Sequence, residues 1–154
     1  VEKLIVADIG VKYYKPHHDE ILAGLSAVDF AKKPSRSEVE EILTPFITDF
    51  GTRQFLMKSL YWTTPGQLDF RFNLEAFIAN KEMIGDALLD GAIFDKPTLF
   101  LKGSNSKYIL ESDFPEIKIH FPKAKLVTIA NAGHWLHAEN PIDFYKQTMD
   151  FLNV

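Results

Sequence analysis

The chain has 154 residues, enough for one domain with a sizeable core, and its 46% hydrophobic and 25% charged residues are ordinary for a globular protein. A net charge of −4 without any basic tract argues against a nucleic-acid partner. The sequence has no cysteine, which excludes disulfides, thiolate chemistry and Cys-based zinc sites, and no apolar run approaches the roughly 20 residues of a membrane span.

The chain opens on a short apolar run, Lys3–Ala7 (KLIVA), which predicts a strand buried on both faces of a parallel sheet. Asp8 follows at once, either as the cap of a turn or as a site residue. Because no start methionine, leader or cap precedes the run, we expect the chain to begin in the middle of a larger domain. We also expect a cytoplasmic protein.

Helical spacing replaces the strand pattern between residues 16 and 91. We expect a first helix around Leu25, a second around Leu43 that Ser35 or Ser37 caps, a third continuing to Leu60, and a fourth around Phe77; Gly51 separates the second from the third. Residues 63–66 (TTPG) predict a turn, and residues 68–72 alternate briefly between apolar and polar.

Strand signals return after residue 95. Pro97–Leu101 and Lys125–Ala130 predict two more buried strands, and between them Asp113 can cap a short helix. A final helix is expected to start at Asn140–Pro141, with one apolar packing face: Ile142, Tyr145, Met149 and Leu152. The order of elements predicts an α/β fold with a core of residues 1–15 and 92–154 and a helical insertion over 16–91.

Candidate polar residues follow all three predicted strands. They are Asp8, the turn Gly103–Ser106 and His134. Sites in parallel α/β sheets gather at the carboxyl ends of the strands, so Asp8 and His134 could converge although 126 positions separate them (134 − 8). Histidine exchanges protons near neutral pH and can act as a base and then as an acid.

Two stretches, Pro97–Gly103 (PTLFLKG) and Ala132–Pro141 (AGHWLHAENP), resemble the C-terminal part of the α/β-hydrolases. The opening Glu2–Ile9 (EKLIVADI) is similar to the strand that follows the nucleophile helix in that fold. His18–Ile21 (HDEI) and Phe70–Leu74 (FRFNL) resemble the small YbfF-like esterases that carry a helical cap. The resemblance covers essentially the whole chain. It implies the C-terminal part of a parallel-sheet α/β-hydrolase fold, with about three strands, flanking helices and a helical cap insertion.

By this resemblance His134 is the general base of a Ser-His-Asp triad. Most members carry an aspartate three residues after Gly103, where this chain has Ser106. Asp8 matches the alternative acid position and would accept a hydrogen bond from His134, a role that neither lysine near Gly103 can fill. Trp135 and Ser106 are candidate substrate contacts. The alternatives are a structural histidine at a helix end, Asp8 as a turn cap and Ser106 as a passive loop residue.

The family's nucleophile elbow, G-x-S-x-G, does not occur in this sequence, and the nearest string, Gly24–Val28 (GLSAV), lacks the second glycine. The oxyanion-hole segment, a His-Gly pair after an early strand, is missing as well. The resemblance therefore implies that this chain supplies His and Asp but not the serine, and that alone it is inactive. His134 and His137 are weak candidates for a metal pair, and no third ligand is obvious, so no metal or cofactor is expected.

A carboxylic ester with a small apolar acyl group is the expected substrate, with acyl thioesters as a further class. The expected partner is the missing N-terminal half of the fold or an oligomeric mate. The alternative function is a non-catalytic small-molecule-binding or interaction module on the same fold.

Overall fold

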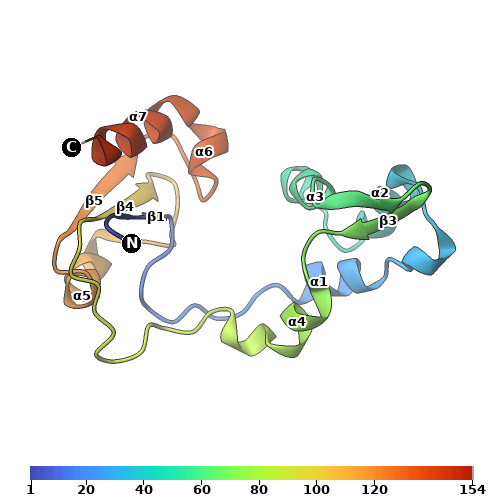
Figure 1. Cartoon of the computed structure of the whole chain (residues 1–154), viewed down its shortest axis with the longest axis horizontal. Coiled ribbons are helices and arrows are strands. Elements are labelled where there is room, and N and C mark those ends of the chain that lie inside the picture. The colour runs from blue at the N-terminus through green and yellow to red at the C-terminus, as the bar shows by residue number, and fades with distance from the viewer. Residues whose placement is uncertain (154) are drawn as a thin grey trace. The chain divides into compact units, whose positions relative to one another are not determined.

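The structure is a computed structural model that describes residues 1–153, and these fall into two units (Figure 1). Unit 1 combines Val1–Tyr13 with the chain from Ala87 onward, and unit 2 is Tyr14–Asp86. Each unit has apolar clusters of its own. Within the described residues, no helix is long and apolar enough to cross a membrane.

Unit 1 is built on a three-stranded parallel sheet in the order β1-β4-β5, which confirms the three predicted strands. The strands are β1 (Leu4–Ala7), β4 (Thr98–Gly103) and β5 (Ala124–Ile129). Ala7 lies opposite Leu101, and Gly103 lies opposite Ile129. Because all three strands run in the same direction, their carboxyl ends meet at one edge of the sheet.

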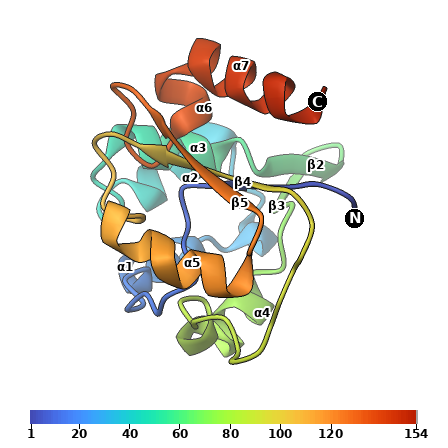
Figure 2. The ribbon, with the colours of Figure 1, turned by 90° about the vertical axis from the view of Figure 1, so that its left-hand side faces the viewer.

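Helices cover both faces of this sheet. Helix α5 (Phe114–His120), preceded by a 3-10 turn at Glu111–Asp113, lies on one face, and α6 (Leu136–Glu139) and α7 (Pro141–Leu152) lie on the other (Figures 1 and 2). Side chains of β4 alternate between the two faces. Phe100 packs in the cluster that contains Ile117 of α5, whereas Leu99 and Leu101 belong to the cluster with Leu136 of α6.

Three expectations for unit 1 were wrong in detail. Strand β1 is only partly buried rather than buried on both faces, because β4 flanks one of its edges and no other strand among residues 1–153 pairs with it. The predicted face of α7 is mostly exposed, with Ile142 at 79% and Tyr145 at 66%, and Phe144 and Phe151 pack on the sheet instead. The side chain of Asp113 makes no cap bond to α5.

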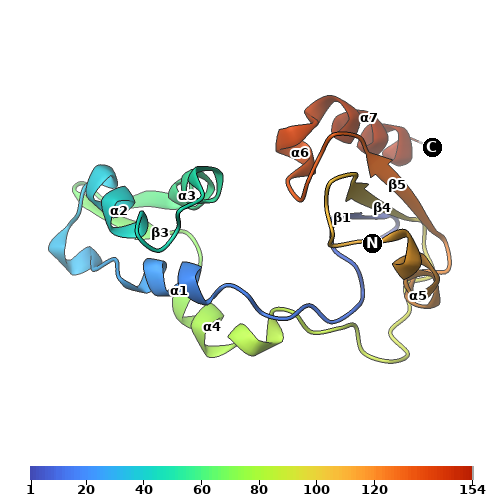
Figure 3. The same cartoon turned by 180° about the vertical axis from the view of Figure 1, so that it is seen from behind.

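Unit 2 contains helices and one β-hairpin around a single apolar cluster (Figure 3). Its elements are α1 (Asp19–Ser26), the 3-10 turn η1 (Phe30–Lys32), α2 (Arg36–Leu43), α3 (Phe50–Met57), β2 (Leu60–Thr64), β3 (Gln67–Phe70), α4 (Leu74–Ala79) and the 3-10 turn η2 (Lys81–Met83). Side chains cap three of these helices locally: Ser35 caps α2, Asp49 caps α3 and Asn73 caps α4.

The hairpin adds two strands to the insertion, where the sequence predicted helices, a turn at 63–66 and a brief alternation over 68–72. Leu60 does not continue the third helix but begins β2, which pairs antiparallel with β3. Aromatic and β-branched residues favour a strand over residues 61–64, and Pro65-Gly66 makes the predicted turn, with Gly66 at φ +79°. Gly51 does not interrupt a helix either. It lies in the first turn of α3, because the side chain of Asp49 accepts a hydrogen bond from the Thr52 N–H and starts the helix there.

Candidate active site

The candidate site lies where the three parallel strands of unit 1 end. Asp8 follows β1, Gly103 closes β4, and His134 lies in the loop between β5 and α6. The parallel order β1-β4-β5 brings these strand ends to one edge of the sheet. Residues 126 positions apart in the sequence are thereby placed in hydrogen-bond contact.

Asp8 is the centre of the polar network, and none of its surface is exposed. Its Oδ1 accepts a hydrogen bond from the Gly103 N–H at 3.0 Å. Its Oδ2 accepts one from Ser106 Oγ at 2.5 Å and one from His134 Nδ1 at 2.9 Å. A carboxylate is costly to bury unless it is hydrogen-bonded, and three donors offset that cost here.

The backbone at Asp8 has an unusual conformation, with φ at +51°. Few residues other than glycine adopt positive φ, and aspartate and asparagine are the most tolerant of them. The Asp8 N–H donates to the carbonyl of Leu101 at 2.7 Å, which extends the β1–β4 pairing by one bond. The carboxylate of the same residue then reaches the end of β4 at Gly103 and the loop that carries His134.

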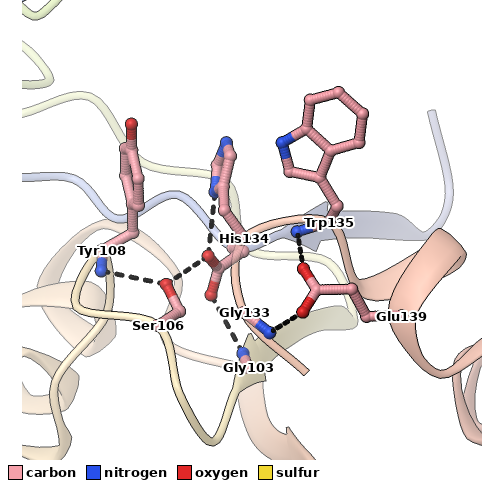
Figure 4. Close-up of polar contacts among 8 residues, drawn as sticks. Gly103, Ser106, Tyr108, Gly133, His134, Trp135 and Glu139 are labelled. Atoms are coloured by element: carbon pink, nitrogen blue, oxygen red, sulfur yellow. Dashed lines mark hydrogen bonds and ion pairs between the residues drawn. The ribbon is translucent and has the colours of Figure 1, made fainter. Parts of the chain in front are cut away.

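The ring of His134 is oriented from two sides. Asp8 engages Nδ1, so in the neutral ring the proton lies on Nδ1, and Nε2 is the basic nitrogen. The ring of Tyr108 stacks on the imidazole, with centroids 4.0 Å apart and planes 20° apart (Figure 4). The side chain of His134 is 44% exposed, so solvent or a substrate can approach the ring.

Glu139 in α6 holds the loop on both sides of His134. Its carboxylate accepts hydrogen bonds from the Gly133 N–H at 2.9 Å and from the Trp135 N–H at 3.2 Å (Figure 4). One side chain thus fixes the backbone N–H groups of the two residues that flank the histidine. The loop begins at Asn131, which has φ +54°.

Gly103 allows the end of β4 to approach the histidine loop closely. A Cβ atom at this position would lie 2.2 Å from the carbonyl oxygen of Gly133 and 2.4 Å from that of Ala132. Both are backbone atoms, which cannot move aside as a flexible side chain can. The absence of a side chain at Gly103 therefore sets the distance between the Asp8 network and the His134 loop.

The other predicted site residues have different surroundings. The Ser106 hydroxyl donates to Asp8 and accepts from the Tyr108 N–H at 3.2 Å, so the serine lies against the Asp8 carboxylate and not against Nε2 of His134. Trp135 is half-buried. His137 faces the ring of Phe144, with ring centroids 6.1 Å apart. Among residues 1–153, no group of three or more His, Asp or Glu side chains is arranged to hold a metal ion.

Sequence reasoning missed three contributors to this site: Gly103 as a close contact, Tyr108 as a stacking partner and Glu139 as the loop clamp. Only Glu139 had a usable signal. A carboxylate a few residues after a small-residue loop, at the start of a helix, can bond exposed backbone N–H groups of that loop.

Comparisons with known proteins agree with the fold and with the resemblance. No protein-family model matches the chain. It is 33% identical to sn-1-specific diacylglycerol lipase ABHD11 of Mus musculus, over 99% of this chain and 51% of the lipase. It is 32% identical to esterase YbfF of Escherichia coli, over 99% of this chain and 58% of the esterase. A solved marine microorganism esterase superposes with a TM-score of 0.88 at 37% identity, covering 98% of this chain and 60% of that one.

The fold and the comparisons define the class of protein: the chain belongs to the α/β-hydrolase superfamily and contains the C-terminal portion of that fold. It spans about half the length of the curated relatives it matches. Within the superfamily it is related to the YbfF-like esterases, as its motifs predicted.

Proposed function

We propose that this chain contributes the base and the acid of a Ser-His-Asp carboxylic ester hydrolase, with His134 as base and Asp8 as acid. The observation that carries the proposal is the bond from His134 Nδ1 to the buried Asp8 carboxylate. That bond leaves Nε2 to take the proton from a serine, and the carboxylate stabilises the imidazolium that results. The names of the relatives, which are esterases and lipases, support the reaction class.

The nucleophile and the oxyanion hole are proposed to come from outside this sequence, because no G-x-S-x-G segment occurs in it. Neither serine considered above fills the role. Ser106 donates its proton to Asp8, and Ser26, in the nearest string to an elbow, is the last residue of α1 and donates to the carbonyl of Leu22 at 2.7 Å. The partner is a further portion of the same fold or an oligomeric mate.

In the complete enzyme, the serine oxygen attacks the ester carbonyl while His134 takes its proton, and an acyl-enzyme forms. His134 then protonates the departing alcohol. Water repeats the sequence to release the acid and regenerate the serine. Unit 2 is proposed to act as the cap of this enzyme, and small apolar acyl esters or acyl thioesters are the proposed substrates. No step needs a metal or a cofactor.

The test compares two histidines that are three positions apart. In the longer protein that supplies the serine, His134→Ala is expected to lower kcat by several orders of magnitude, because the base is lost. His137→Ala, whose ring contacts only Phe144 among the interactions described, should stay within tenfold of the unmodified enzyme. A loss below tenfold for His134→Ala would refute its role as base.

The isolated chain gives a second test. A serine-directed fluorophosphonate probe is expected to leave it unlabelled, and hydrolysis of p-nitrophenyl butyrate should not exceed the buffer rate. Labelling of the chain would contradict the assignment of the nucleophile to a segment outside it.

A further inference from the structure

Unit 2 contains an apolar cavity of its own, of about 500 Å³, lined by residues of α1, α3 and α4 and of neighbouring loop segments. This volume lies within the range of ligand pockets, roughly 300–1,000 Å³. Leu22, Leu25, Phe55 and Phe77 are among the side chains that line it, and its walls are almost wholly apolar. All its lining residues belong to unit 2, so neither Asp8 nor His134 takes part in it.

Three polar side chains interrupt the apolar lining: His18, Lys58 and Ser59. The Ser59 hydroxyl donates to the Leu56 carbonyl at 2.6 Å and is thereby satisfied. Lys58 is exposed, and its ammonium group forms no ion pair with residues 1–153. A lysine in such a place lays its methylenes along the apolar wall and keeps its charge at the opening. His18 also lines the cavity, and its buried Nδ1 has no hydrogen-bond partner among the described residues. An unsatisfied buried nitrogen costs free energy that a polar ligand atom would recover.

We propose that this cavity binds a medium-chain alkyl carboxylate, with the alkyl chain against the apolar side chains and the carboxylate at Lys58. Charge complementarity selects this ligand, because the cavity offers apolar walls and one unpaired cation. Burial lowers the pKa of His18, and the neighbouring His17 lowers it further while Asp19 opposes the shift. The ring is therefore neutral near pH 7 and adds hydrogen-bonding capacity without a second charge.

The first experiment is a calorimetric titration of the 154-residue chain at pH 7 with hexanoate, octanoate and decanoate. Each buried CH₂ contributes about 0.8 kcal/mol, so each two-carbon step should tighten binding about 15-fold until the cavity is filled. The NMR ring signals of His18 should shift along the same saturation curve. Binding that fails to saturate, or that ignores chain length, would overturn the proposal.

Matched variants locate the site. Phe55→Glu puts a carboxylate into the lining and should weaken decanoate binding more than tenfold, whereas Phe50→Glu, on the same helix and outside the lining, should leave it unchanged. Both positions are exposed, at 50% and 65%, so both variants should fold. Equal loss in the two variants would show that the fatty acid binds elsewhere.

The role of Lys58 is tested by removing its charge while keeping its stem. Lys58→Met should weaken decanoate binding at least threefold and leave the affinity for decanol, which has no charge, unchanged. Equal changes for both ligands would refute the carboxylate contact. Sedimentation of the unliganded chain supplies the last check: a dimer that decanoate dissociates would mean that a second copy, and not a fatty acid, is the occupant.

Discussion

The helix caps of unit 2 and the central carboxylate of unit 1 are satisfied in different ways. In unit 2 the caps are local: Ser35, Asp49 and Asn73 each accept a hydrogen bond from a backbone N–H three residues later. In unit 1 the central carboxylate, Asp8, meets Gly103 and His134, which are 95 and 126 positions away. Local caps form with the helix they start, whereas the Asp8 network can form only after the parallel sheet has assembled.

The two units should therefore be sensitive to substitution at different kinds of position. Unit 1 depends on backbone segments that approach one another closely, so one added atom disturbs the site. Unit 2 depends on separate helix caps and on apolar packing. Each single substitution there should therefore lower the free energy of unfolding by a limited amount. The following changes separate these two kinds of sensitivity.

Gly103→Ala should have the largest effect on stability, because its Cβ would lie 2.2 Å from a backbone oxygen. Overpacking of this kind costs about 3 kcal/mol, and urea unfolding monitored by NMR should show it in unit 1. Gly51→Ala is the matched control in unit 2. Its Cβ would meet only the Asp49 carboxylate at 3.3 Å, and alanine favours the helix, so its stability should fall by less than about 0.5 kcal/mol or rise. Equal losses would remove the contrast between the units.

Glu139→Ala should be next, because it removes the carboxylate that bonds the Gly133 and Trp135 N–H groups. We expect about 1–2 kcal/mol of local destabilisation, seen as faster hydrogen exchange at those two amides. Glu116→Ala, in the first turn of α5, controls for the loss of a helical glutamate in the same unit. If exchange at the two amides is unchanged, Glu139 does not hold the loop.

Ser35→Ala tests a local cap in unit 2. The serine hydroxyl accepts the Glu38 N–H and donates to the Glu38 carboxylate, so alanine removes these two bonds. The backbone N–H of residue 35 can still donate to Glu38. The expected cost is about 1 kcal/mol in urea denaturation. Ser37→Ala, inside the helix, should cost less than about 0.3 kcal/mol, since alanine is the better helix former. The reverse ranking would assign the cap to Ser37.

The smallest expected effect concerns how the stability of unit 1 depends on pH in acid. Burial on its own raises the pKa of Asp113, but the Leu110 N–H and the Lys12 ammonium outweigh it, and the pKa lies below its ordinary value. A depressed pKa contributes stability above the unfolded value of about 3.9, and the contribution is lost as the pH falls through the folded pKa. Lys12→Met should therefore lower stability near neutral pH and flatten its acid dependence below about pH 4. Lys146→Met, at an exposed pair with Asp150, is the control.

Much of this architecture could be predicted from the sequence because buried parallel strands are continuous apolar runs. The runs at Lys3–Ala7, Pro97–Leu101 and Lys125–Ala130 located the sheet and, with it, the edge where Asp8 and His134 meet. The assignment of His134 as base and Asp8 as acid stays a prediction, as does the cytoplasmic location.

Other features could not be read from the sequence, because they depend on what the fold places nearby. Helical spacing predicted that Ile142 and Tyr145 lie on the packing face of α7. In the structure, Phe144 and Phe151 pack on the sheet instead. Leu60 fits the helical spacing of the residues before it, and yet it begins strand β2. It does so because it pairs with Phe70 across the hairpin, a contact that local spacing does not reveal. The closeness of Gly103 to Gly133 has no sequence signal.

Two independent requirements restrict which residue can occupy position 8. Its positive φ of +51° admits glycine, asparagine and aspartate with the least strain, and its proposed role as the acid beside His134 requires an acceptor with negative charge. Only aspartate meets both demands. In a saturation library at this codon, a screen for folding should recover all three residues, while a screen for the proposed hydrolysis should recover aspartate alone.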